Sequence, residues 1–319
     1  MKNYIKHFEG KNVLITGGAG FIGSNLSRFL ADNGANVIAL DNYSTGREEN
    51  TLDFNSLGIE LIETDISKQQ ETSKYFSEID YVFHQAAVPS VPRSISEPLL
   101  TNSSNINGTL AVLENSRLNS VKKVVFAASS SAYGDTEVLP KDTTMKPSPL
   151  SPYAVQKLAG EMYCKTYFDN FGLRTTSLRY FNVYGPYQDP NSEYSAVIPI
   201  FIKKALADKP ITIFGDGTTS RDFTFIEDVI QANLCAAIST KSDGHVVNVA
   251  YGDRFTLTEL ANKIIEELAS KSTIEYSDFR KGDVLHSLAD LSTTKELIDY
   301  DPQFSLSEGL SKTIAFYKN

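Results

Sequence analysis

With 319 residues and a formal net charge of −9 at pH 7, the chain can form one large α/β unit or two closely packed ones. The acidic balance argues against a nucleic-acid or anionic-membrane partner, because neither surface attracts a negatively charged protein. The two cysteines form no CxxC motif and the four histidines are scattered, so we expect neither a disulfide framework nor a metal site. Residues 1–11 lack the apolar segment of a signal peptide, and no run of about 18 apolar residues occurs, so we expect a cytoplasmic protein.

Short apolar runs alternate with helical patterns over the first 180 residues. The predicted strands are 12–16, 36–41, 59–65, 81–87, 123–130 and 174–183, and the predicted long helices are 21–33 and 152–171. This alternation is typical of βαβ units. It predicts the α/β class, with a doubly wound parallel sheet of the Rossmann type.

The pattern loosens after about residue 184, where turn-forming residues become frequent. Further strands are predicted at 211–214 and 245–250, and helices at 225–239, 256–270 and 292–300. We therefore expect a larger domain at 1–180 and a smaller C-terminal α/β domain at 181–319, with 222–251 returning to the larger one. A cleft between the two domains would hold the ligands.

A glycine-rich turn, TGGAGFIG at 16–23, joins the first strand to the first helix. Its GxxGxxG spacing departs from GxGxxG, but the strand before it and the helix after it match a dinucleotide-binding turn. Glycine lets the backbone approach a pyrophosphate, and the helix N-terminus attracts the anion. Asp41 ends the second strand 18 residues after Gly23, where its carboxylate can bind a ribose 2′-OH and repel a 2′-phosphate. We therefore predict NAD rather than NADP, bound by the 1–180 domain.

The ends of the third and fourth strands offer further contacts for this cofactor. An acidic residue after the third strand can reach the adenine of the cofactor. Small residues after the fourth strand let the cofactor lie against the strand ends. Simple packing explains the residues at both strand ends equally well. The predicted cofactor-binding residues are Gly17, Gly20, Phe21, Ile22, Gly23, Asp41, Asn42, Asp65, Ile66, Gln85, Ala86, Ala87, Tyr153 and Lys157.

Tyr153 and Lys157 lie four residues apart in the helix that follows a serine-rich strand end, Ser129-Ser130-Ser131. At that spacing both side chains share one helical face. A lysine ammonium and a cationic nicotinamide would stabilise the tyrosine phenolate and lower its pKa, so that Tyr153 could exchange a proton with a sugar hydroxyl. YxxxK alone is a weak signal, but its place after the glycine turn favours a catalytic interpretation.

Taken together, the glycine turn, Asp41, the serine cluster before Tyr133-Gly134 and YxxxK resemble the extended short-chain dehydrogenase/reductase family over nearly the whole chain. RYFNVYGP at 179–186 resembles the sugar-binding segment of that family. GDGTTSRDF at 215–223 and RKGDVLHSLAD at 280–290 resemble the nucleotide-binding segments of its UDP-sugar 4-epimerases. The resemblance implies that Ser129 is the catalytic hydroxyl, beside Tyr153 and Lys157. It also implies a homodimer joined through the helices near 100–118 and 153–170.

The part of the site that binds the UDP-sugar needs cations and small polar groups. Arginine suits diphosphate oxygens, a carboxylate can accept from a ribose hydroxyl, and the loop at 90–94 can line the sugar pocket. The predicted substrate-binding residues are Ser90, Arg93, Ser129, Ser130, Asn182, Arg221, Arg280, Asp283 and Ser287.

The resemblance also bears on the reaction. Sugar 4,6-dehydratases of this family carry an acidic pair where this chain has Ser129-Ser130-Ser131, so we expect an epimerase. Ser287, seven residues after Arg280, matches the position beside the sugar C2 substituent and is small, which predicts UDP-GlcNAc and UDP-GalNAc as substrates, with UDP-Glc and UDP-Gal also accepted. The alternatives are a UDP-uronic acid 4-epimerase or decarboxylase, another NAD-dependent nucleotide-sugar oxidoreductase, or an NAD-binding sensor without chemistry. The complete set of Ser129, Tyr153 and Lys157 argues against the sensor.

Overall fold

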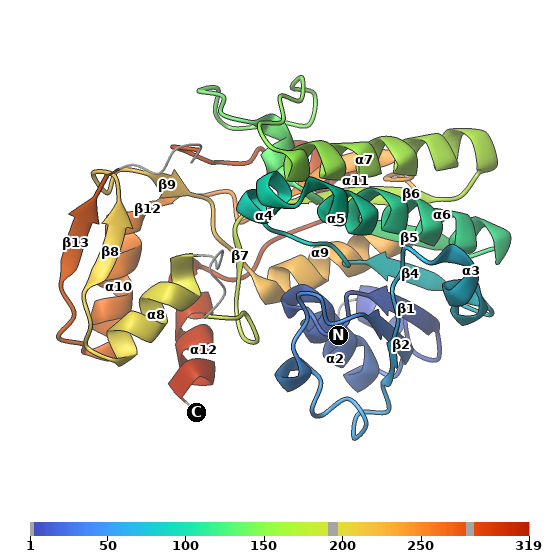
Figure 1. Cartoon of the computed structure of the whole chain (residues 1–319), viewed down its shortest axis with the longest axis horizontal. Coiled ribbons are helices and arrows are strands. Elements are labelled where there is room, and N and C mark those ends of the chain that lie inside the picture. The colour runs from blue at the N-terminus through green and yellow to red at the C-terminus, as the bar shows by residue number, and fades with distance from the viewer. Residues whose placement is uncertain (1–2, 191–196, 279–283, 319) are drawn as a thin grey trace.

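The computed structural model describes residues 3–190, 197–278 and 284–318 (Figure 1). Its centre is a seven-stranded sheet in the order β11-β6-β5-β4-β1-β2-β3, with every adjacent pair parallel. The strands are β1 (Asn12–Thr16), β2 (Asn36–Asp41), β3 (Glu60–Glu63), β4 (Tyr81–His84), β5 (Lys123–Ser129), β6 (Thr175–Tyr180) and β11 (His245–Val249). The predicted fold class, a doubly wound parallel sheet, is confirmed.

Helices cover both faces of this sheet. One face carries α2 (Phe21–Asp32) and α9 (Ile226–Ile238), and α11 (Ser292–Ile298) packs against β11 and α9. The opposite face carries α3 (Gln69–Thr72), α6 (Gly108–Leu118) and α7 (Pro152–Phe171), and the short helices α4 (Val91–Ser96) and α5 (Pro98–Asn102) lie along α7 (Figure 1). The remaining short helical segments are α1 (Asn3–Lys6), η1 (Glu48–Asn50), η2 (Ser73–Phe76), η3 (Ser103–Asn107) and η4 (Ser130–Tyr133).

Alternation along the buried strands divides the apolar core between the two faces. In β1, Val13 and Ile15 join the cluster beneath α2 and α9, whereas Leu14 joins the cluster beneath α6 and α7. Successive side chains of a strand point to opposite faces, so a strand buried on both sides must be apolar throughout. This is why the unbroken run NVLIT could be recognised as a central strand.

The C-terminal unit is built on a two-stranded parallel sheet, β8 (Ile211–Phe214) with β13 (Ile274–Ser277), covered by α8 (Val197–Leu206), α10 (Leu257–Leu268) and α12 (Leu306–Lys318) (Figure 1). Two short pairings connect it to the larger unit: β7 (Val183–Tyr184) with β10 (Thr224–Phe225), and β9 (Ser220–Arg221) with β12 (Phe255–Thr256). The cluster beneath α9 continues into this unit through Ile202, Ile211 and Leu260. The two units therefore share one core, and their division at residue 180 stays a prediction.

The chain returns to the central sheet after starting the C-terminal unit. Strand β11 pairs with β6 along its whole length and forms the sheet edge. Just before β11, Asp243 Oδ1 lies 2.7 Å from Nζ of Lys123, whose side chain is fully buried at the start of β5. The returning segment therefore supplies both the last strand and the counter-ion for a buried ammonium.

Three of the predicted strands extend beyond the observed ones by two or more residues at their carboxyl ends, whereas 12–16, 36–41 and 211–214 match the observed bounds. The strand expected at 174–183 ends at Tyr180, because Asn182 adopts the left-handed region with φ of 33° and turns the chain away from the sheet. The strands expected at 59–65 and 81–87 end at Glu63 and His84. No helix among the described residues is both long and apolar enough to cross a bilayer.

Candidate functional site

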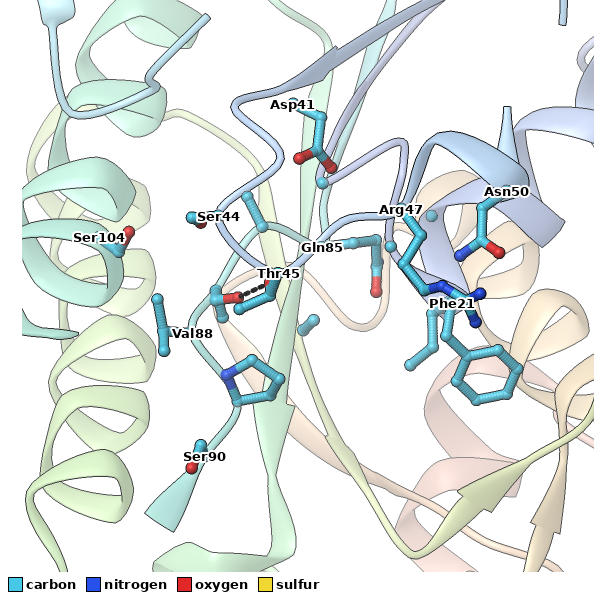
Figure 2. A pocket seen from close by; sticks show the side chains of 18 of the residues that line it. Phe21, Asp41, Ser44, Thr45, Arg47, Asn50, Gln85, Val88, Ser90 and Ser104 are labelled. Atoms are coloured by element: carbon cyan, nitrogen blue, oxygen red, sulfur yellow. Dashed lines mark hydrogen bonds between the residues drawn. The ribbon is translucent and has the colours of Figure 1, made fainter. Parts of the chain in front are cut away.

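A cavity of about 730 Å³ opens at the carboxyl ends of the central strands, where the loops after the neighbouring strands β1 and β4 begin (Figure 2). Ligands of open parallel sheets bind in this position, outside the strand ends where the strand order reverses. Sixteen of the residues predicted from the sequence line the cavity: Gly17, Gly20, Phe21, Ile22, Gly23, Asp41, Asn42, Ile66, Gln85, Ala86, Ala87, Ser90, Arg93, Tyr153, Lys157 and Asn182.

The glycine turn is tightly packed at two positions. A Cβ on Gly17, whose φ is 74°, would lie 2.7 Å from the nitrogen of Ala86, and a Cβ on Gly23 would lie 2.0 Å from the carbonyl oxygen of Gly17. Helix α2 begins after Gly20 with no side-chain cap and no acidic residue in its first turn. Its N-terminal N–H groups and partial positive charge therefore face the cavity, and these features fit a dinucleotide pyrophosphate.

Asp41 lies at one end of the cavity, beside this turn (Figure 2). Its carboxylate accepts from the N–H of Ala19 at 2.9 Å and from the N–H of Tyr43 at 2.8 Å. Burial raises the pKa of this carboxyl, and the backbone hydrogen bonds oppose that shift. The geometry fixes the carboxylate at the strand end where the sequence predicts contact with a ribose.

The loop after β2 contributes cavity residues that the sequence reasoning missed. Ser44, Thr45, Arg47 and Asn50 line the cavity, and Figure 2 shows them between Asp41 and Phe21 or beside the strand ends. Arg47 Nη1 lies 3.3 Å from Oδ1 of Asp189, which lines the cavity from the loop after β7. The polar run NYSTGREEN directly after Asp41 was the available signal for this loop.

The predicted catalytic side chains converge from two adjacent elements. Ser129 ends β5, and Tyr153 and Lys157 lie in the first two turns of α7, where Ser151 caps the helix by accepting from the N–H of Ala154. The side chain of Ser129 lies close enough to Tyr153 to lower the pKa of the tyrosine. Tyr153 and Lys157 line the cavity, whereas Ser129 and Ser130 lie just outside its lining.

Burial shifts the pKa values of both ionisable side chains of this trio. Burial raises the pKa of Tyr153 above its ordinary value, and the side chain of Ser129 opposes the shift. Lys157 Nζ donates to the carbonyl oxygen of Ala127 at 2.7 Å, and burial lowers the pKa of this lysine to about 8. The lowering of the tyrosine pKa that is expected beside a cationic nicotinamide stays a prediction.

Tyr133, a second tyrosine close to the serine cluster in the sequence, has its hydroxyl bonded to another residue. It is buried beneath the cavity, and its hydroxyl donates to Oδ1 of Asn248 at 2.6 Å. Burial raises its pKa as well. Of these two tyrosines, Tyr153 is therefore the one available to a ligand in the cavity.

The loop before α4 lines the far end of the cavity from Asp41 (Figure 2). Ser90 caps α4 by accepting from the N–H of Arg93 at 3.0 Å, and Arg93 Nε lies 3.6 Å from Oε1 of Glu97. Ser94 accepts from the N–H of Tyr153 at 3.1 Å, which ties this loop to the start of α7. The sugar-pocket loop predicted at 90–94 therefore contacts the catalytic helix.

Ser287 is buried behind the cavity and connected to it through Asn182. Its Oγ accepts from Nδ2 of Asn182 at 3.1 Å and from the N–H of Asp222 at 3.3 Å. Asp222 in turn accepts from the N–H groups of Tyr251 and Gly252, and burial raises its pKa to about 7. The segment carrying Ser287 is thus fixed against the cavity residue Asn182.

Five of the predicted residues that the structure describes do not line the cavity: Asp65, Ser129, Ser130, Arg221 and Ser287. Asp65 accepts from the N–H of Ser67 at 2.9 Å and closes its own turn, whereas its neighbour Ile66 lines the cavity. Arg221 Nη1 donates to the carbonyl oxygens of Ser220 and Leu285. Arg280 and Asp283 lie outside the described residues.

Comparison with known proteins supplies a family match. The model of the NAD-dependent epimerase/dehydratase family matches residues 13–250. A UDP-glucose 4-epimerase of Mycolicibacterium smegmatis is 37% identical over 312 residues, covering 96% of this chain and 98% of that protein.

Two solved structures resemble the whole chain. A UDP-N-acetylglucosamine 4-epimerase from Methanobrevibacter ruminantium, in complex with UDP-N-acetylmuramic acid, is 39% identical with a TM-score of 0.92, covering 97% of this chain and 99% of that one. A UDP-glucuronic acid 4-epimerase from Bacillus cereus, in complex with UDP-glucuronic acid and NAD, is 33% identical with a TM-score of 0.88, covering 96% and 99%. The three relatives differ in the sugar that their names give.

Proposed function

Because this chain belongs to the NAD-dependent epimerase/dehydratase family, we propose that it is a 4-epimerase that interconverts UDP-GlcNAc and UDP-GalNAc and also accepts UDP-Glc and UDP-Gal. The observation that carries the proposal is that Tyr153 and Lys157, one turn apart on α7, line the cavity that the glycine turn closes, with the Ser129 side chain next to Tyr153. General acid–base groups must lie within reach of the substrate and beside the cofactor site.

In this proposal Tyr153 exchanges one proton with the sugar 4-hydroxyl in each direction. Tyr153 accepts the proton as C4 is oxidised to a ketone, and returns it after the 4-keto sugar has turned over in the pocket. NAD, when bound, accepts and returns the hydride at C4. Ser129 holds the same sugar oxygen, and Lys157 supplies positive charge near the phenolate. The net reaction consumes no cofactor, because the electrons return to the carbon that lost them.

The substrate assignment rests on the small side chain of Ser287. It is buried and bonded to Asn182, which lines the cavity, so a larger side chain at position 287 would push towards the sugar. An acetamido group needs space and polar partners, and serine provides both. The likeness to a UDP-N-acetylglucosamine 4-epimerase supports this assignment.

A panel of UDP-sugars tests the function directly. The purified protein is incubated without added NAD with the N-acetylated pair, the plain hexose pair and UDP-glucuronic acid, and the products are resolved by chromatography. We expect 4-epimers from the first two pairs, with the N-acetylated pair used at least as well. Stoichiometric release of NADH, or no conversion of any sugar, would contradict the epimerase.

A second candidate is a UDP-uronic acid 4-epimerase or decarboxylase. Arg93 lines the cavity from α4, and a guanidinium there could bind a sugar carboxylate, although Glu97 partly neutralises it. The likeness to a UDP-glucuronic acid 4-epimerase supports the same class. Rapid conversion of UDP-glucuronic acid in the panel would favour this candidate over an epimerase for the N-acetylated pair. The carbon dioxide released is measured in the same experiment.

We expect NAD to bind at least about tenfold more tightly than NADP, because a buried carboxylate at Asp41 would repel a 2′-phosphate. Arg47, the cation nearby, already pairs with Asp189 and Glu49. Titration of the cofactor-stripped protein with each dinucleotide, followed by fluorescence, measures both affinities. Equal or tighter NADP binding would remove Asp41 from its predicted role.

We also expect a homodimer formed by the helices on the α7 face. Ile95, Leu99, Val155 and Met162 are at least half exposed on α4, α5 and α7, which lie side by side (Figure 1). Contiguous exposed apolar side chains are typical of an interface. The double substitution Leu99→Glu with Met162→Glu should give monomers in sedimentation measurements. The control Leu52→Glu, equally exposed but after β2, should leave the dimer intact. A wild-type monomer at micromolar concentration would contradict the proposal.

A further inference from the structure

A buried ion pair lies directly behind the proposed catalytic lysine. Glu161 follows Lys157 by one helical turn on α7 and meets Arg179 of β6. Arg179 Nε donates to Oε1 of Glu161 at 2.9 Å, and Nη2 donates to Oε2 at 2.8 Å. Each side chain is only 4% exposed. Burying two charges carries a large desolvation cost, and well-packed apolar residues often serve stability equally well. Stability alone is therefore a weak reason for this pair.

The pair is fixed on the side away from the lysine. The guanidinium of Arg179 lies 4.5 Å from the ring centroid of Tyr133, whose hydroxyl donates to Asn248. In the sheet, Arg179 stands between Ala128 of β5 and Asn248 of β11. The carboxylate of Glu161 is thus held by Arg179, and the Arg179 guanidinium in turn packs on the Tyr133 ring of η4.

Lys157 is fixed on its other side by β5. Its Nζ donates to the carbonyl oxygen of Ala127, and lies 5.0 Å from the ring centroid of Phe126. Neither group carries a charge. The lysine therefore sits between a neutral strand and its own helix.

The titratable groups near Lys157 are Tyr153, Glu161 and Cys164 on its own helix and His84 on β4. Burial raises the pKa of Cys164 to about 12 and lowers that of His84 to about 3, so both are neutral at pH 7. Burial also raises the pKa of Tyr153. Among these groups, Glu161 is the one carboxyl, and the Arg179 guanidinium of β6 is paired with it.

We propose that Glu161, clamped by Arg179, is the positioning residue for Lys157: it fixes the turn of α7 that carries the lysine and places a carboxylate one turn from the ammonium. This inference rests on the proposed role of Lys157 in the epimerase. Arg179 acts through Glu161 and touches neither the substrate nor the cofactor in this proposal.

The first test is Glu161→Gln, which removes the charge and keeps the shape. The Lys157 pKa is measured by NMR on protein labelled with ¹³C at the lysine ε carbon, with Lys157→Met assigning the signal. We expect this pKa to fall by at least about half a unit, since burial then acts with less opposition. We expect kcat to fall about tenfold with KM for the UDP-sugar nearly unchanged, because substrate contacts are untouched.

A double variant separates positioning from stability. Glu161→Gln leaves Arg179 buried and unpaired, which can destabilise the fold, whereas Glu161→Leu with Arg179→Met replaces both partners by apolar groups. We expect the double variant to recover the wild-type melting temperature but to keep the lowered Lys157 pKa and the lowered kcat. Lys165→Met, which breaks an exposed pair with Asp169 on the same helix, should change none of the three quantities.

Recovery of kcat and of the Lys157 pKa in the double variant would show that the pair serves only stability and would overturn the inference. A Glu161→Gln protein with the wild-type Lys157 pKa and the wild-type kcat would also overturn the inference. Failure of the proposed function gives a different result: Lys157→Met would then turn over normally, whatever the Glu161 variants do.

Discussion

Replacing Tyr153 with phenylalanine is expected to lower turnover by at least about 10²-fold, the loss typical of removing a general acid–base group. The substitution deletes the hydroxyl that lies beside the Ser129 side chain and leaves the ring in the first turn of α7. Turnover is measured with the best UDP-sugar of the panel at saturating concentration.

The fold and the cofactor site should survive this change. The backbone N–H of Tyr153 still donates to Ser94, and the glycine turn is not touched. The melting temperature and the bound NAD content are therefore the controls. Tyr163→Phe, on the same helix, is a matched variant that should keep full activity. Near-wild-type turnover in Tyr153→Phe would remove this residue from the mechanism.

Replacing Ser287 with tyrosine should reduce kcat/KM for UDP-GalNAc about 100-fold while UDP-Gal loses much less. The added ring cannot fit where Ser287 is buried against Asn182 and Asp222, so it must displace the segment next to the cavity. An acetamido group needs that space, and a hydroxyl at C2 does not. The ratio of the two kcat/KM values is the measured quantity.

Ser287→Ala separates size from hydrogen bonding. It removes the acceptor used by Asn182 but adds no bulk, so UDP-GalNAc should remain a good substrate. Because overpacking can cost about 1–3 kcal/mol, the melting temperature of each variant is measured as well. An unchanged preference in a folded Ser287→Tyr protein would mean that Ser287 does not limit the size of the sugar.

The central sheet was predictable because its strands are buried on both faces and alternate with helices. The unbroken apolar runs of β1 and β5 and the glycine turn between β1 and α2 are local signals, visible without the rest of the chain. The C-terminal helix α12 and strand β13 were missed. Strand β13 has a mostly exposed pattern, and its pairing with β8 brings together residues far apart in the chain, a contact that no local pattern reveals.

The site was predictable where one motif positions several side chains. The glycine turn, Asp41 and the Tyr153–Lys157 spacing each lie on a single element, so their approach to one cavity follows from the fold. The contacts of Asp189 with Arg47, and of Arg179 with Glu161, join separate elements and could not be derived from spacing. The rise that burial causes in the Tyr153 pKa could not be derived from spacing either, since burial is a property of the folded environment.

The late return of β11 has a consequence for synthesis on the ribosome. Every residue of β6 is buried, yet the strand that covers its open edge is made only after much of the C-terminal unit. Until then β6 offers unpaired N–H and C=O groups to any passing strand, and Lys123 lacks the carboxylate of Asp243. A chain released at residue 180 would keep both defects permanently. We therefore expect this edge to stay open to mispairing until Val249 has emerged from the ribosome.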